Sequence, residues 1–153
     1  MDVVALAFLT TFFGTGGLPV VDFAGSCSGP TFPGTNLLQC SQIGQDIKTC
    51  QDAGKIVLLS LGGAIGSYGF SSASQAQTFA TTLWNVFGGG SSSTRPFGSS
   101  VVDGFDLGAF SAGITLTVDI ENQEPNYYSD FITALRSLYS GGSKSYYITG
   151  APQ

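Results

Sequence analysis

Apolar runs and helical repeats alternate along the chain. Residues Val3 to Phe12, VVALAFLTTF, are almost continuously apolar, which is typical of a strand buried on both faces in a parallel sheet. The runs KIVLLSLGG (Lys55 to Gly63) and VVDGFDL (Val101 to Leu107) predict a second and a third strand. The closing stretch KSYYITGAPQ (Lys144 to Gln153) predicts a fourth strand that is cut short just past its end.

Segments with helical spacing separate these predicted strands. Ser41 to Ala53 is the first, and Gly54 suits the left-handed position just beyond a helix. Ser74 can cap the second helix, and a third follows the acidic region. The apolar residues at helical spacing are Ile43, Ile47 and Cys50, then Phe79, Leu83 and Phe87, then Tyr128, Phe131, Leu135 and Leu138.

This alternation predicts right-handed βαβ units, with a parallel sheet and helices packed outside it. Four such strands are compatible with a small open sheet or with half of an eight-stranded barrel. Length favours neither, because a (β/α)₈ barrel typically takes about 250 residues and doubly wound domains fit in about 150. The 153 residues are enough for one domain.

The amino-acid composition limits the kinds of molecule that this chain could bind. Only 10% of the residues are charged and 42% are hydrophobic, which predicts a packed globular fold. The net charge of −5, with only five Lys and Arg, argues against nucleic acid or an anionic membrane surface and favours a neutral ligand. No apolar run approaches the ~20 residues of a membrane helix. The first residues also lack the basic region and cleavage pattern of a signal peptide.

Missing residue types exclude several chemistries. The chain has no histidine, which removes Ser-His and Cys-His nucleophile pairs and imidazole metal sites. Its three cysteines, Cys27, Cys40 and Cys50, are too few and too widely spaced for a four-thiolate zinc site. Carboxylates, tyrosines and hydroxyls remain as catalysts, and we expect neither a metal nor a cofactor.

Four carboxylates lie in the stretch VVDGFDLGAFSAGITLTVDIEN. They form two pairs, Asp103 with Asp106 and Asp119 with Glu121. Acids two residues apart on a strand share one face, and the carboxyl ends of barrel strands open into the active-site cleft. Because neighbouring negative charges disfavour ionisation, such a cluster can keep one acid protonated for general acid catalysis.

Specific motifs occur in a fixed order: VALAFL, FAGSC, VLLSLGGAIGSYGF, LWNVFGGG, RPFG, VVDGFDL, DIEN and YYITGAPQ. Together they resemble glycoside hydrolase family 18, and within it the class III, hevamine-like fungal and plant chitinases, over residues 2–153. In that family SLGG ends the third barrel strand and DxxDxDxE ends the fourth. The resemblance implies an α/β fold, a partial TIM (β/α)₈ barrel of about strands 2 to 5. It makes residues 1–153 a single incomplete catalytic domain.

The resemblance also implies roles for the four acids. Glu121 matches the proton donor to the glycosidic oxygen. Asp119 matches the residue that orients the substrate's 2-acetamido group, whose carbonyl oxygen attacks the anomeric carbon. Asp103 and Asp106 match the outer acids that support Asp119. The implied substrate is chitin or a chitooligosaccharide, with no nucleic acid, membrane or obligate protein partner.

Sugar contacts are expected around the SLGG segment. SLGGAIGS lacks the GxGxxG spacing and the lysine of a phosphate loop, so we interpret it as close backbone packing at the cleft floor. Trp84 falls inside a predicted helix and is expected in the core. The predicted substrate-binding residues are Ser60, Gly62, Gly63, Tyr68, Phe70 and Gln153.

The family pattern implies a pairing of the cysteines. Cysteines matching Cys27 and Cys40 pair in the loop after the second barrel strand. The cysteine matching Cys50 pairs with one near the family's N-terminus, which has no counterpart in this chain. We therefore expect a Cys27–Cys40 disulfide, a free thiol at Cys50, and a secreted or cell-wall location for the intact relative.

Residues 108–118, GAFSAGITLTV, interrupt the acidic motif. Without them the sequence would read VVDGFDLDIEN, whereas an extended segment of this length would cover about 36 Å at ~3.3 Å per residue. Our hypothesis is translated intron sequence or a misplaced splice junction. In one threading VVDGFDL remains the strand; in the other, ITLTVDIE replaces it.

Both threadings separate Asp106 from Asp119, so we expect no chitinase activity from this chain alone. The alternatives are a non-catalytic glycan-binding relative and a non-functional product of a defective gene. The first alternative usually lacks the catalytic acid, whereas Glu121 is present.

Overall fold

The computed structural model describes residues 2–107 and 126–150. Within these ranges the strands are β1 (Val3–Thr11), β2 (Val20–Val21), β3 (Ile56–Leu61), β4 (Gly104–Leu107) and β5 (Tyr147–Gly150). The α-helices are α1 (Ser41–Asp52), α2 (Ala73–Val86) and α3 (Tyr128–Tyr139), and the short 3₁₀ helices are η1 (Thr15–Gly17) and η2 (Ala24–Ser26). All four predicted strands and all three predicted helices are present.

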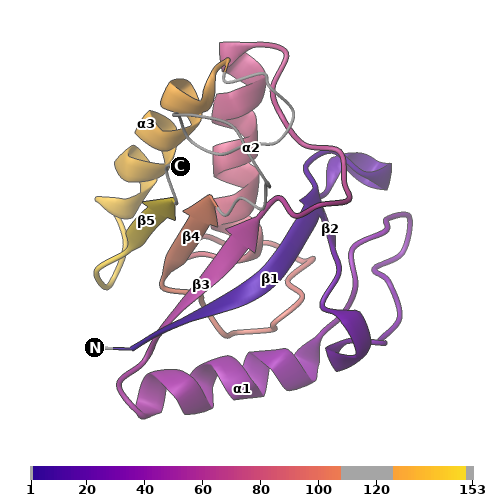
Figure 1. The fold of residues 1–153 in the computed structure, drawn as a ribbon, viewed down its shortest axis with the longest axis vertical. Helices are drawn as coiled ribbons and strands as arrows, with labels where there is room; N and C mark the ends of the chain where they lie inside the picture. The colour runs from indigo at the N-terminus through magenta and orange to yellow at the C-terminus, as the bar shows by residue number, and fades with distance from the viewer. Residues whose placement is uncertain (1, 108–125, 151–153) are drawn as a thin grey trace.

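The strands form one sheet in the order β2-β1-β3-β4-β5 (Figure 1). β1, β3, β4 and β5 run parallel, as the βαβ pattern predicts. β2 runs antiparallel to β1, where Phe8 and Asp22 exchange two backbone hydrogen bonds of 2.9 Å. The sequence did not predict β2, because two residues are too short to show a strand periodicity.

The core lies between the sheet and the three α-helices; α2 and α3 pack against each other (Figure 1), and α1 adds Ile43 and Ile47. Alternate side chains of the central strands enter it, with Leu59 and Phe105 completely buried. Phe79, Leu83 and Phe131 meet them from the helices and are at most 1% exposed. Burying one such side chain stabilises the fold by about 1.5–3 kcal/mol. The helical positions predicted from the sequence are thus among the residues that stabilise this core.

The prediction that β1 is buried on both faces is wrong. Val3 is 56% exposed, and Ala5 and Ala7 on the same face are also exposed. Val4 and Leu6, which point to the other face, pack against the core. An apolar run shows that a strand can be buried on two sides, but the described helices cover only one of them.

Two ends of helices test the capping predictions. Gly54 follows α1 with φ of +75°, in the left-handed conformation expected there. α2 is capped by Ser72, whose hydroxyl accepts a hydrogen bond from the Gln75 amide at 3.1 Å, and Ser74 lies inside the helix. The predicted cap was therefore two residues too late. No helix in the described ranges is long and apolar enough to span a membrane.

Cys27 and Cys40 form a disulfide, and Cys50 is a free, half-buried thiol, as the family pattern implied. The disulfide connects η2 to the start of α1 across 13 positions of sequence. Trp84 is only 7% exposed in α2, which confirms its predicted place in the core.

Candidate functional site

A row of polar side chains crosses three adjacent parallel strands. Ser60 of β3 is paired in register with Asp106 of β4, which is paired with Thr149 of β5. Paired residues of neighbouring strands point to the same face of a sheet, so the three side chains lie side by side. The Ser60 hydroxyl donates to one Asp106 carboxylate oxygen at 2.8 Å, and the Thr149 hydroxyl donates to the other at 2.6 Å.

These two hydrogen bonds fix the orientation of the Asp106 carboxylate. Hydroxyl donors bound to an ionised acceptor make short, strong hydrogen bonds, and here one comes from each side. Each carboxylate oxygen has about two acceptor positions, so Asp106 can still accept a hydrogen bond from a further donor. The row therefore fixes the position of one carboxylate and leaves part of its capacity to accept hydrogen bonds free.

The backbone after β3 packs closely, as predicted for SLGG. Gly62 and Gly63 have φ of +118° and +102°, which side-chain-bearing residues rarely adopt. A methyl group at Gly63 would lie 3.2 Å from the Phe8 ring. This turn borders a hollow of about 350 Å³, lined by Ala7, Phe8, Thr10, Asp22, Ala24, Gly63, Ala64 and Ile65.

The two predicted aromatic sugar contacts differ in their surroundings. Tyr68 is half-buried, and its hydroxyl donates to the Gly63 carbonyl at 3.0 Å. Phe70 is only 7% exposed. Its ring centroid lies 4.9–5.8 Å from those of four other buried rings, namely Phe12, Phe79, Tyr128 and Phe131. Because core side chains surround Phe70, the expectation that it contacts a sugar is corrected; the role of Tyr68 stays a prediction.

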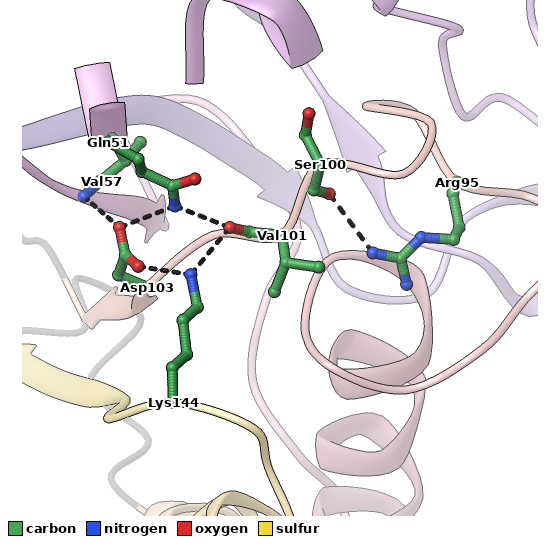
Figure 2. A network of polar contacts seen from close by, with 7 residues as sticks. All are labelled: Gln51, Val57, Arg95, Ser100, Val101, Asp103 and Lys144. Carbon is green, nitrogen blue, oxygen red and sulfur yellow. Dashed lines mark hydrogen bonds and ion pairs between the residues drawn. The ribbon is translucent and has the colours of Figure 1, made fainter. Parts of the chain in front are cut away.

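Asp103 is separate from the Asp106 row. It directly precedes β4, and its amide donates to the carbonyl of Val57, the second residue of β3, at 2.7 Å. Its carboxylate is bonded to Gln51, Lys144 and the Val57 amide (Figure 2). No hydrogen bond within the described ranges joins Asp103 to Asp106, so the two predicted outer acids belong to different groups.

Arg95 in the RPFG motif organises the loop that leads into β4. Its guanidinium donates to the carbonyls of Asn85, Gly88, Gly90, Gly98 and Ser100 at 2.6–3.3 Å. The contact with Ser100 is drawn in Figure 2. Burial lowers the pKa of Arg95 from its usual value. These contacts tie the end of α2 to the segment before β4.

The sequence interpretation missed Thr149, Gln51 and Lys144. Thr149 is the polar residue of an otherwise apolar strand, and that contrast was a usable signal. Gln51 and Lys144 gave no such signal, because polar residues in a helix and in a loop are usually solvated. Gln51 and Lys144 bind Asp103 because α1 and the loop before β5 both lie next to the start of β4 in the fold.

Several predicted site residues lie outside the described ranges. These are Asp119, Glu121 and Gln153, together with the interrupting residues 108–118. The roles of Asp119, Glu121 and Gln153 therefore stay predictions.

Among the residues that the structure describes, no group of three or more His, Cys, Asp or Glu could hold a metal ion.

Comparisons with known proteins identify the family. The model for glycosyl hydrolases family 18 matches residues 1–153. Chitinase 1 of Rhizopus niveus is 51% identical over 151 residues, which cover 99% of this chain and 27% of that protein. The ICChI chitinase of Ipomoea carnea superimposes with a TM-score of 0.76 at 30% identity, covering 96% of this chain and 47% of the other.

A second solved structure is similar to the same extent. The xylanase and alpha-amylase inhibitor protein of Scadoxus multiflorus has a TM-score of 0.73 at 31% identity and covers 99% of this chain. This chain spans 48% of the inhibitor protein. It is thus similar to about half of each solved relative and about a quarter of the Rhizopus enzyme. With the family model matching along the whole sequence, the chain belongs to glycosyl hydrolase family 18.

Proposed function

We propose that this chain is the acid-bearing part of a chitinase-type glycoside hydrolase. The substrate is chitin or a chitooligosaccharide, and the reaction is hydrolysis of β-1,4 linkages between N-acetylglucosamine units. The observation that carries the proposal is the Ser60–Asp106–Thr149 row on adjacent parallel strands, in which Asp106 belongs to the family's acidic motif. Family membership and the named chitinases among its relatives support the same activity.

In the proposed mechanism Glu121 gives its proton to the glycosidic oxygen as the bond to the anomeric carbon breaks. The carbonyl oxygen of the substrate's own 2-acetamido group bonds to that carbon, and Asp119 orients and polarises the group. Water then attacks the anomeric carbon, the bond from that carbon to the acetamido oxygen breaks, and the water loses its proton to Glu121, which restores the acid and retains the configuration. Asp106, held by Ser60 and Thr149, supports Asp119 with its fixed negative charge.

The proposal also includes a partial TIM barrel. β1, β3, β4 and β5 correspond to barrel strands 2 to 5, and the face with Val3, Ala5 and Ala7 corresponds to the barrel interior. Tyr147 of β5, which is 39% exposed, lies on the same face in register with Gly104. The 47% coverage of the Ipomoea carnea chitinase supports this assignment. Active sites of such barrels lie at the carboxyl ends of the strands, where Asp106 is found.

A non-catalytic binding role is the second candidate. The observation in its favour is the similarity to a protein described as an inhibitor of xylanase and alpha-amylase. Glu121 favours the hydrolase, because loss of the catalytic acid is the usual mark of a non-catalytic relative. The interruption at 108–118 nevertheless separates Asp106 from Asp119, and we propose that the chain of 153 residues has no turnover by itself. The Cys27–Cys40 disulfide supports an oxidising, extracellular location.

The proposal is tested by adding the barrel segments that this chain does not contain. The chain without residues 108–118 is joined to the flanking segments of the Rhizopus niveus chitinase, and release of a fluorophore from a labelled chitooligosaccharide is measured. We expect turnover by the completed protein, loss of turnover with Glu121→Gln, and retention with Glu124→Gln, a nearby acid outside the motif. Turnover by the unmodified chain, abolished by Glu121→Gln, would contradict the proposed inactivity. A folded completed protein without turnover would favour the binding role.

A further inference from the structure

Asp103 joins several elements at the amino end of β4. One carboxylate oxygen accepts hydrogen bonds from the Val57 amide and from the Gln51 side chain of α1, both at 2.8 Å. The other oxygen forms an ion pair with Lys144, which lies in the loop before β5. Figure 2 shows these groups converging on the carboxylate of Asp103. The Asp103 side chain is 12% exposed.

Val101 reinforces the same junction. Its carbonyl accepts hydrogen bonds from Gln51 at 2.8 Å and from Lys144 at 3.2 Å (Figure 2). Lys144 therefore uses two of its three donors on the segment that enters β4. Gln51 and Lys144 each bond to both Val101 and Asp103, and together they hold this segment from two sides.

The backbone of Asp103 begins the pairing of β4 with both of its neighbours. Its amide donates to the Val57 carbonyl at 2.7 Å, and its carbonyl accepts from the Tyr147 amide at 2.9 Å. Three residues further along, Asp106 has partners on the same two strands, Ser60 and Thr149. Because a slip of one residue turns every side chain of a strand to the opposite face, the pairing at Asp103 determines whether Asp106 reaches these hydroxyls.

The approach of β5 to β4 is unusually close at this end. A methyl group on Gly104 would lie 1.9 Å from the Tyr147 carbonyl oxygen, so only glycine fits between the two backbones. The ion pair between Asp103 and Lys144 joins the segments that lead into the same two strands. It is also less exposed than the pair of Lys48 with Asp52, whose side chains are 72% and 66% exposed. Lys144 is 34% exposed but Asp103 is buried, so loss of Lys144 leaves a buried carboxylate without its cation, a cost that exposed pairs avoid.

We propose that Lys144 and Asp103 are positioning residues for Asp106. Their ion pair fixes β4 between β3 and β5 and thereby forms the Ser60–Asp106–Thr149 row at the opposite end of the strand. Lys144 is the residue to vary, because among the described residues it is the one on the β5 side that binds the Asp103 carboxylate. The link to catalysis rests on the proposed hydrolase function; the link to the geometry of the row does not.

A double-mutant cycle between Lys144 and Thr149 tests this coupling without substrate. Hydrogen exchange of the β4 and β5 peptides is followed by mass spectrometry at low protein concentration. We expect Lys144→Met to accelerate exchange about tenfold and Lys144→Arg to remain near the native rate, since arginine can donate to the same two oxygens. Thr149→Val should accelerate exchange about fivefold in the native chain and less than about 1.5-fold in Lys144→Met.

Lys55→Met is the matched control, because it removes the ion pair with Asp2, whose carboxylate side chain is 70% exposed. Thr149→Val should keep its full fivefold effect in that background, as expected for independent sites. If Thr149→Val acts equally with and without Lys144, then Lys144 only stabilises the fold and the proposal is overturned. If Lys144→Met does not fold, Gln51→Leu replaces it, and the same loss of the Thr149 effect is expected.

The kcat and KM of Lys144 variants in the completed enzyme test the link between this proposal and the proposed hydrolase function. Lys144→Met should lower kcat about tenfold at unchanged KM, and Lys144→Arg should restore it. A native kcat in Lys144→Met would contradict the link to catalysis. A completed protein with no activity would refute the hydrolase function alone, since the exchange cycle still decides whether Lys144 positions the row.

Discussion

Asp103 and Asp106 lie three positions apart in the same motif, yet their surroundings differ. Asp103 is 9% exposed and is held by a backbone amide, a glutamine and a lysine. Asp106 is half-buried and is held by two hydroxyl groups on neighbouring strands. One carboxylate is therefore buried and paired with Lys144, whose side chain is 34% exposed, whereas the other has no cation among its hydrogen-bond partners in the described structure.

This difference shows how one acidic motif can serve two purposes. A buried carboxylate that binds a backbone amide, a glutamine and a lysine at the surface contributes to the placement of the strands around it. A carboxylate held only by hydroxyls keeps its negative charge available to a neighbouring acid or to a substrate. An odd spacing of three residues also places the two side chains on opposite faces of an extended strand.

The largest expected effect comes from Asp103. Asp103→Ala removes the ion pair with Lys144 and leaves the Val57 amide and the Gln51 side chain without the acceptor they share, so the free energy of unfolding should fall by about 3–4 kcal/mol. Asp106→Asn keeps the shape of the side chain and one acceptor, and should cost about 1 kcal/mol. Urea denaturation of the two variants gives the comparison. Equal losses would show that the two carboxylates do not differ as described.

The disulfide should contribute nearly as much to stability. Closing the loop between Cys27 and Cys40 stabilises the fold by about 3 kcal/mol through the entropy of the unfolded chain, and Cys40→Ser should lose that amount. Cys50→Ser is the control and should cost less than about 1 kcal/mol, because Cys50 is a half-buried thiol packed against the core. Thiol titration of the oxidised, denatured protein should find the single free thiol, Cys50. A titre of three thiols would exclude the disulfide.

The turn after β3 gives a smaller effect. Gly63→Ala forces a side chain into a conformation with φ of +102° and places its methyl group against Phe8. The expected loss of stability is about 1–2 kcal/mol. Gly25→Ala should stay within about 0.5 kcal/mol, because a methyl group there meets no atom within 4 Å. Thermal unfolding of both variants measures the difference, and a native midpoint for Gly63→Ala would contradict a strained turn.

Buried tyrosines predict a dependence on alkaline pH. Burial raises the pKa of Tyr128 and of Tyr139 well above the usual 10.0, so the folded chain keeps protons that the unfolded chain loses. Their contribution is complete below pH about 10 and is lost as the pH rises further. Thermal midpoints measured from pH 8 to 11.5 should therefore fall above about 10.

Tyr128→Phe should flatten that fall. The Tyr128 hydroxyl is buried and has no hydrogen-bond partner in the described residues, so its removal at pH 7 should be neutral or stabilise by up to about 1 kcal/mol. Tyr139→Phe removes a hydrogen bond of 3.2 Å to the Tyr147 carbonyl and should cost about 1 kcal/mol. An unchanged alkaline slope in Tyr128→Phe would show that the phenol does not control it.

The sequence predicted the regular part of this fold well. Helical spacing identified the residues that α2 and α3 bury, such as Phe79 and Phe131, because these positions follow from local geometry. The cap of α2 was misplaced because Ser71, Ser72 and Ser74 are all suitable cap residues. Which serine caps the helix depends on how the chain enters it, and that is not encoded in one residue.

The candidate site was only partly predictable. Ser60 and Asp106 lie in recognisable motifs, and the structure joins them directly. Thr149 completes the row through the register of β5, which depends on contacts with residues more than 40 positions away. The exposed face of β1 could not be predicted for the same reason, since an apolar strand does not specify what covers it.

The catalytic role that distinguishes Asp106 from Asp103 is tested most directly by the kcat of Asp106→Asn in the completed enzyme. The kcat of Asp106→Asn is measured on a labelled chitooligosaccharide and compared with that of Asp2→Asn, an exposed acid in the pair with Lys55. We expect Asp106→Asn to lower kcat by about a hundredfold, because it removes a fixed charge next to the reacting groups, while the protein stays folded. Retention of kcat within about threefold by folded Asp106→Asn would contradict a catalytic role for the Ser60–Asp106–Thr149 row.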